Sequence, residues 1–207
     1  LRNAGARLLP SDVDPEGWDL DAVGATLRRA APRLAYLVPD FQNPTGHLMS
    51  DAQRQEYAAH LRRSRTTAVV DEAHQALALQ GQEMPRPFAS FGADTVTIGS
   101  ASKAFWGGLR LGWIRAPREA VERLTRARVS LDLGAPVLEQ LVLVRLLADP
   151  AIVEANRTRL REQRDALVDA VGSALPQWSF HVPTGGLALW CRLPAPLGTA
   201  VAAEAEL

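Results

Sequence analysis

Lysine is almost absent from this chain. Of its 23 basic residues 22 are Arg, and the only Lys is Lys103. Arg keeps its proton in proteins, whereas a Lys that is desolvated or placed beside another cation can lose it. A neutral amine is a nucleophile toward carbonyl groups. The single Lys lies in a glycine-rich segment, residues 99–113, so it is either a surface residue in a flexible loop or a reactive amine. Its spacing alone favours neither.

Other absences exclude whole classes of function. The one cysteine, Cys191, rules out an internal disulfide framework or a Cys-rich zinc site, and we expect it in the core. His47, His60 and His181 do not have the spacing of metal ligands, so no metal site is predicted. No apolar run reaches the length of a membrane span, and no signal peptide is evident. The formal net charge of +0 gives no reason to expect binding to nucleic acid or membranes through these residues. We expect a cytoplasmic protein.

The apolar runs predict an α/β fold with a mostly parallel sheet and flanking helices. Strands are expected at residues 34–38, 66–70, 95–98 and 111–115. Helices are expected from Asp19 or Asp21 to 30, and at 50–63, 118–130, 136–148 and 149–171. The helix 136–148 is apolar around much of its circumference, which predicts burial, whereas alternating Arg and acidic residues in 149–171 predict a solvated, salt-bridged face. Two alternating strands, 178–182 and 187–191, are expected to begin a small α+β domain.

Polar residues follow three of the predicted strands. Asn43, Asp71 and Ser100 each come at or just after a strand end, and in such sheets ligands bind at the carboxyl ends of the strands. We therefore expect one site there. Taken singly, Asn43 in Asn-Pro-Thr-Gly is better explained as a turn residue, and the alternative for Asp71, a loop carboxylate, is the weaker one because Asp71 directly follows a buried apolar strand.

Three ordered segments carry a family resemblance. Residues 100–112, with Lys103 and a Gly-Gly-Leu-Arg-Leu-Gly run, resemble the Schiff-base segment of fold-type I pyridoxal-phosphate enzymes, the class I/II aminotransferases. Residues 41–46 resemble the family's Asn-Pro-Thr-Gly segment, and residues 69–74 its strand-end Asp segment. The interval of seven positions from Lys103 to Arg110, and the Ala-Phe-Trp-Gly-Gly run between them, resemble the aminotransferase-like domain of MocR-type regulators of the GntR family.

The resemblance implies a role for each residue. Lys103 would form the Schiff base with pyridoxal 5'-phosphate and carry the proton at the substrate α-carbon, and Asp71 would keep the pyridine nitrogen protonated, so these two are the predicted catalytic residues. Cofactor binding is assigned to Asn43, Asp71, His74, Ser100, Ser102, Lys103 and Arg110. Asn43 would donate to the phenolic oxygen; both serines and Arg110 would hold the phosphate. His74 stands where many aminotransferases have Tyr. It is either a donor to the same phenolic oxygen or a partly exposed loop residue.

The resemblance also implies an organisation and two functions. Residues 1–150 would form a partial cofactor-binding large domain, and residues 151–207 an interdomain helix and part of a small C-terminal domain, within a longer, homodimeric protein. The first function is amino-group transfer between an amino acid and a 2-oxo acid. The alternative is a pyridoxal-phosphate-sensing effector domain of a MocR-type regulator with little or no catalysis. The sequence does not identify the substrate.

Overall fold

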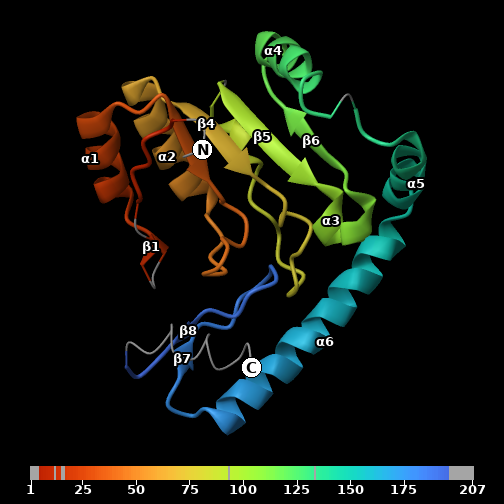
Figure 1. The fold of residues 1–207 in the computed structure, drawn as a ribbon. Coiled ribbons are helices and arrows are strands. Elements are labelled where there is room, and N and C mark those ends of the chain that lie inside the picture. The colour runs from red at the N-terminus through yellow and green to blue at the C-terminus, as the bar shows by residue number, and fades with distance from the viewer. Residues whose placement is uncertain (1–4, 12, 15–16, 93, 133, 196–207) are drawn as a thin grey trace.

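A four-stranded sheet lies at the centre of the molecule (Figure 1). The computed structural model describes residues 5–11, 13–14, 17–92, 94–132 and 134–195. The strands are β3 (Leu34–Leu37), β4 (Thr67–Asp71), β5 (Thr95–Ser100) and β6 (Gly112–Arg115), in the order β3-β4-β5-β6. The first three are parallel and β6 is antiparallel to β5. The predicted α/β class with a mostly parallel sheet is therefore confirmed, and each of the four expected strands is present.

The helices that precede β3 and β4 begin at side chains that cap them. Helix α1 (Leu20–Ala30) starts after Asp19, whose carboxylate accepts a hydrogen bond from the backbone N–H of Ala22 at 2.9 Å. Helix α2 (Asp51–Ser64) starts at a capping box, in which Ser50 and Gln53 each bond the other's backbone N–H. Such caps satisfy N–H groups that have no partner inside the helix. Both helix starts were predicted.

The longest helix, α6 (Pro150–Ala174), runs from the β6 side of the sheet to the C-terminal segment (Figure 1). Asp149 accepts the backbone N–H of Ala151 at 3.0 Å, and proline occupies the first turn, where no N–H partner is needed. The remaining elements are β1 (Val13–Asp14), β2 (Gly17–Trp18), η2 (Phe88–Ser90), α3 (Ala101–Ala104), η3 (Gly107–Leu109), α4 (Arg118–Arg128), α5 (Val137–Leu147), β7 (Ser179–Phe180) and β8 (Cys191–Arg192).

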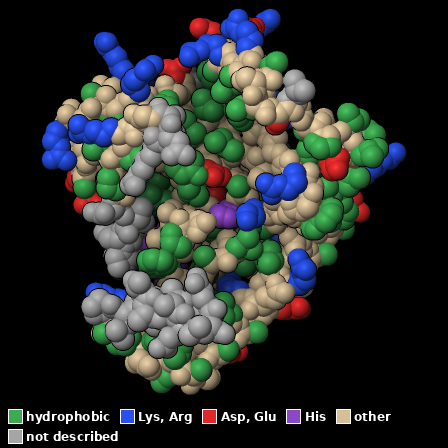
Figure 2. All heavy atoms as spheres, in the orientation of Figure 1, with side chains coloured by type: hydrophobic (Ala, Val, Ile, Leu, Met, Phe, Trp, Pro, Cys, Tyr) green, Lys and Arg blue, Asp and Glu red, His purple; other side chains and the backbone are tan. Residues whose placement is uncertain are grey.

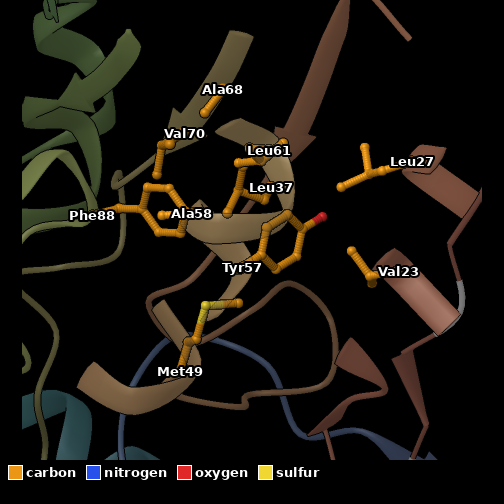
Figure 3. Close-up of a cluster of buried hydrophobic side chains, with 10 residues drawn as sticks. All are labelled: Val23, Leu27, Leu37, Met49, Tyr57, Ala58, Leu61, Ala68, Val70 and Phe88. Atoms are coloured by element: carbon orange, nitrogen blue, oxygen red, sulfur yellow. The ribbon is translucent and has the colours of Figure 1, made fainter. Parts of the chain in front are cut away.

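The main core lies between the sheet and the helices α1 and α2 (Figure 3). Leu37 and Val70 are paired in the β3–β4 register and point toward the helices together. The buried cluster comprises Val23, Leu27, Leu37, Met49, Tyr57, Ala58, Leu61, Ala68, Val70 and Phe88. Burying a side chain as large as Leu or Phe contributes about 1.5–3 kcal/mol. This cluster fixes the positions of β3 and β4 and so of the loops that leave their carboxyl ends.

Among the described residues, few side chains cover the opposite face of the sheet at β3. Because side chains alternate along a strand, Tyr36 and Val69, which are paired in the register, point away from the core, and so does Asp71 two residues further on. Tyr36 is 57% exposed and Leu34 is 58% exposed. A polar side chain of the predicted site therefore stands on the same face as an accessible tyrosine.

The prediction that the helix at 136–148 is buried was wrong. None of the residues of α5 is buried, and Leu138 is 75% exposed. Only one side of the helix meets the rest of the chain, where Leu143 and Leu146 pack against a second cluster around Leu109 and Leu111. A helix that is apolar all round needs neighbours on every side to be buried, and the described residues supply them on one side only.

The strand expected at 178–182 is present but short, since β7 covers two residues, and the prediction of a strand at 187–191 was wrong, because residues 187–190 are not in a strand and β8 begins at Cys191. The segment between them instead lies against the loop that follows β4. Backbone hydrogen bonds join Leu79 N–H to Thr184 O at 2.9 Å and Gly186 N–H to Leu77 O at 3.0 Å. Two segments that are far apart in the sequence, residues 77–79 and 184–186, are therefore hydrogen-bonded to each other. Within the described ranges, no helix is long and apolar enough to cross a membrane.

Candidate functional site

The residues predicted from the strand ends lie along one edge of the sheet. Asp71 ends β4, Ser100 ends β5, and Asn43 lies in the loop that follows β3. Because these three strands are parallel, their carboxyl ends meet at the same edge. The Asn43–Pro44 peptide bond is cis, and Gln42 closes the loop by accepting the backbone N–H and the hydroxyl of Thr45 at 3.0 and 2.6 Å.

A cavity of about 100 Å³ opens at this edge. Its lining consists of Phe41, Gln42, Asn43, Gly46, His74, Lys103, Leu187 and Ala188. Asn43, His74 and Lys103, which come from three different segments of the sequence, therefore meet in one place. Figure 2 shows histidine and basic side chains next to each other near the centre of this face, with an acidic side chain close by. The lone lysine faces a cavity rather than standing in an isolated loop.

His74 is buried beside Lys103. Its Nδ1 atom has no hydrogen-bond partner within the part of the chain that the structure describes. Burial lowers the pKa of His74, and the positive charge of Lys103 lowers it as well, against the opposing effects of Asp71, the Phe41 carbonyl and Asp40. A neutral imidazole has one N–H donor and one acceptor nitrogen. The site therefore offers a ligand a buried ring nitrogen that the protein itself leaves unpaired.

Both oxygens of Asp71 are held by neighbours. Oδ1 accepts the backbone N–H of Ala73 at 2.9 Å, and Oδ2 accepts the hydroxyl of Tyr36 at 2.6 Å. Tyr36 was not among the residues predicted from the sequence. The signal that could have found it is strand alternation, which places Tyr36 on the face of the sheet that carries Asp71. The neighbouring carboxylate, Glu72, accepts the Phe88 N–H at 3.1 Å, and burial raises its pKa.

The three residues predicted to hold a phosphate lie within seven positions of Lys103 along the chain. The backbone N–H of Ser102 donates to Ser100 Oγ at 3.2 Å. Arg110 follows η3 with a left-handed backbone (φ 52°), and its side chain is exposed. These residues lie outside the lining of the cavity that Lys103 shares with Asn43 and His74.

An ion pair buried behind the site anchors the loop that carries Asn43. Arg54 and Asp40 are both fully buried, with Arg54 Nη2 2.6 Å from Asp40 Oδ1. Arg54 also donates from Nε to Met49 O at 2.9 Å and from Nη1 to Arg86 O at 3.1 Å. Burial raises the pKa of Asp40 more than Arg54 lowers it. The pair was not predicted from the sequence, because nothing local distinguishes Arg54 from the other helical arginines.

Helix α6 is hydrogen-bonded to the short helix that carries Lys103. Asn156 Nδ2 donates to the carbonyl oxygens of Ala104 at 3.0 Å and Lys103 at 3.5 Å. These carbonyls belong to the last residues of α3 and would otherwise lack an intrahelical partner. No sequence signal pointed to Asn156. The side chain nevertheless fixes where the lysine emerges.

The arginines of α6 form the predicted salt bridges on the helix and also donate hydrogen bonds to backbone carbonyls of neighbouring loops. Arg157 and Arg164 do pair with acidic residues of the helix, Glu154 at 3.3 Å and Asp165 at 2.7 Å. Yet Arg157 also donates to Ala76 O at 2.7 Å, Arg164 to Pro183 O at 3.0 Å, and Arg161 to Leu79 O. The helix passes along the 76–79 loop, so its arginines satisfy loop carbonyls that have no partner in a strand or helix.

The backbone at Gly185 packs closely against Leu77 and Phe41 beside the cavity. A Cβ at Gly185 would lie 2.4 Å from Leu77 O and 2.4 Å from the Phe41 ring. Only glycine fits at this position, because neither the backbone oxygen nor the buried ring can move away cheaply. The approach carries the next residues, Leu187 and Ala188, to the cavity. Among the described residues, no group of three or more His, Cys, Asp or Glu could hold a metal ion.

Comparisons with known proteins agree on one family. The family model described as "Aminotransferase class I and II" matches residues 2–206. A 2-aminoadipate transaminase from Thermus thermophilus is 32% identical over 205 residues, which are 95% of this chain and 51% of that protein. YisV from Bacillus subtilis, an uncharacterized HTH-type transcriptional regulator, is 28% identical over 92% of this chain and 40% of its own length. The chain thus spans about half the length of the curated relatives or less.

A solved structure matches the fold. The crystal structure of LysN, the α-aminoadipate aminotransferase of Thermus thermophilus in complex with N-(5'-phosphopyridoxyl)-L-leucine, superposes with a TM-score of 0.85 at 31% identity. The match covers 93% of this chain and 51% of that one.

Proposed function

This chain belongs to the aminotransferase class I and II family, and we propose that it binds pyridoxal 5'-phosphate at Lys103 and takes part in amino-group transfer between an amino acid and a 2-oxo acid. The observation that carries the proposal is the cavity shared by the chain's single lysine with Asn43 and His74, at the edge of the sheet where Asp71 ends β4. The LysN complex and the 2-aminoadipate transaminase support this assignment by similarity.

The donor set fits this cofactor. The amine of Lys103 matches its aldehyde, and the carboxylate of Asp71 matches its ring nitrogen. The amide of Asn43 matches its phenolic oxygen. The two serine hydroxyls and the Arg110 guanidinium match its phosphate. The unpaired buried nitrogen of His74 adds one more hydrogen-bonding atom at the cavity. When bound, the cofactor supplies a protonated pyridine ring that withdraws electrons from the substrate α-carbon.

The protein's own residues would divide the remaining work. Lys103 Nζ would hold the cofactor through its aldehyde group, and the same amine would move the proton at the substrate α-carbon as a general base and acid. The Asp71 carboxylate holds the proton on the ring nitrogen. Asn43 and His74 donate hydrogen bonds to the phenolic oxygen. Ser100, Ser102 and Arg110 bind the phosphate, Arg110 through a charge-assisted contact.

We further propose the domain division and assembly that the family resemblance implies. Residues 1–150 form part of the cofactor-binding domain, and residues 151–207 form an interdomain helix and part of a small C-terminal domain. A second copy of the chain pairs with it. The exposed apolar side chains of α5, among them Val137 and Leu141, support association, because contiguous exposed apolar surface usually marks an interface.

A second function is favoured by the likeness to HTH-type regulators. In that case the same site binds the cofactor as an effector, and little or no transfer follows. One experiment separates the two functions: the purified protein is mixed with pyridoxal phosphate and a panel of amino donors and 2-oxo acids, with Lys103→Ala as the control. Transfer that requires Lys103 supports the enzyme. Binding at Lys103 without transfer across the panel supports the effector domain, and absence of binding contradicts both.

His74 gives the free energy of unfolding a dependence on pH. Because its folded pKa lies below the ordinary value of 6.5, the unfolded chain binds the proton more readily, and the folded state loses stability as the pH falls below about 6.5. The loss amounts to about 1.4 kcal/mol for each unit by which the pKa is lowered. We expect His74→Gln to lose less stability than the unmodified protein between roughly pH 7 and pH 5.

Urea unfolding at the two pH values measures this difference. The matched control is His181→Gln, because His181 is exposed. The pKa values of Asp40 and Glu72 are raised, so these two groups increase the free energy of unfolding as the pH falls. Both are present in every variant, so their contribution cancels from the comparison to first order. An equal loss in His74→Gln and in the unmodified protein would show that His74 is not buried as described.

A further inference from the structure

Tyr36 reaches across the sheet to the carboxylate at the end of the next strand. The register pairs Tyr36 with Val69, so Asp71 lies two residues further along β4 on the same face. Diagonal neighbours of this kind are within reach of a long aromatic side chain. The hydroxyl of Tyr36 donates to Asp71 Oδ2 at 2.6 Å, which is the distance typical of a hydroxyl bonded to a charged carboxylate.

The two hydrogen bonds to Asp71 come from different directions along the chain. Tyr36 approaches Oδ2 from β3, and the Ala73 N–H approaches Oδ1 from the loop after β4. One donor on each oxygen fixes the plane of the carboxylate, while each oxygen keeps a second lone pair free for a ligand. Partial burial, and then the hydrogen bond and charge of Asp71, raise the pKa of Tyr36 well above its ordinary value. The phenol therefore stays a donor throughout the neutral range.

We propose that Tyr36 is a positioning residue that orients the Asp71 carboxylate for the ring nitrogen of the cofactor; this inference rests on the function proposed above. A carboxylate held in one plane keeps its free lone pairs in a fixed direction, and a negative charge aimed at the ring nitrogen favours the protonated form of that nitrogen. Tyr36 itself touches neither the reacting atoms nor the substrate.

The chain offers a matched pair of variants for the test. It contains two tyrosines, and Tyr57 is buried in the main core, where it packs edge-on against Phe88 on the other side of the sheet. Tyr36→Phe and Tyr57→Phe each remove one hydroxyl, but only the first removes a donor to Asp71. Because Tyr36 is 57% exposed, its hydroxyl can be deleted without disturbing the core.

Two readouts on pyridoxal phosphate labelled with ¹⁵N in the ring report the effect. We expect Tyr36→Phe to weaken cofactor binding by about 5- to 10-fold, the effect of one lost hydrogen bond. We expect the ring-nitrogen NMR signal of the bound cofactor to move toward that of unprotonated pyridine, which a merely structural role would not cause. Tyr57→Phe should match the unmodified protein in both. Unchanged affinity and an unchanged nitrogen signal in Tyr36→Phe would overturn the proposal.

A titration without cofactor tests the contact itself. In the Tyr57→Phe background the ultraviolet absorbance of tyrosinate reports Tyr36 alone, and adding Asp71→Asn should lower its titration midpoint. An unchanged midpoint would overturn the proposal, and this measurement remains available if Tyr36→Phe fails to fold. If the unmodified protein binds no pyridoxal phosphate, the proposed function fails and this proposal with it. If it binds normally and only Tyr36→Phe is without effect, this proposal alone fails.

Discussion

Lys103→Ala is expected to abolish covalent fixation of pyridoxal phosphate. When the unmodified protein is mixed with the cofactor and reduced with borohydride, we expect one label per chain, on the peptide that contains Lys103. The reason is that the chain holds a single lysine, and this lysine faces the cavity with Asn43 and His74. Only a neutral amine forms a bond with the aldehyde, and the guanidinium groups of the 22 arginines do not lose their protons.

The matched control is Lys103→Arg, which keeps the positive charge beside His74 but cannot form the bond. It should lose the label as completely as Lys103→Ala, and peptide mass mapping measures both. If the label persists in either variant, it lies on the terminal amine, and the assignment of Lys103 is wrong. If the arginine variant still binds cofactor reversibly, the phosphate-binding and ring-binding contacts are sufficient for affinity, and Lys103 supplies the covalent step.

The second large effect is expected from breaking the buried ion pair. Arg54→Met leaves Asp40 fully buried without a cation and deprives the carbonyls of Met49 and Arg86 of their donor. Removing one partner of a buried pair typically costs about 3–5 kcal/mol, because the remaining charge stays desolvated and uncompensated. We expect a loss of this size in the free energy of unfolding, measured by urea denaturation with the slope unchanged.

Two further variants identify the cause of that loss. Arg63→Met changes an exposed arginine of the same helix and should stay within about 0.5 kcal/mol of the unmodified protein. Asp40→Asn combined with Arg54→Met removes both charges, so the double variant should lose less than the sum of the two single variants. Additive losses would mean that Arg54 acts through its carbonyl contacts and not through Asp40.

The same pair matters for the site because of where it lies. Asp40 directly precedes the loop of residues 41–46, and Met49 N–H returns to Pro39 O at 2.9 Å, so the loop is closed at its base. A shift here would move Asn43 and the Phe41 ring together, since both line the cavity. Loss of stability in Arg54→Met is therefore expected to be accompanied by weaker cofactor binding.

The sequence by itself determined the features that depend on local spacing. Helix starts at Asp19, Ser50 and Asp149 follow from hydrogen bonds to N–H groups two or three residues away, so the residue types alone predict them. Buried strands follow from apolar runs, and parallel strands bring their polar ends to one edge whatever the details of packing. Asn43, Asp71 and Ser100 were found in this way, whereas Lys103 was singled out as the only lysine of the chain and by the family resemblance.

Only the tertiary structure decided which side chains support that edge. Tyr36 meets Asp71, Asn156 meets the Lys103 turn, and Gly185 meets Leu77 across separations of 35 residues or more. Such contacts depend on strand register and on the path of α6, which no local pattern encodes. The exposure of α5 was mispredicted for the same reason, since burial is decided by what else packs against a helix and not by its own composition.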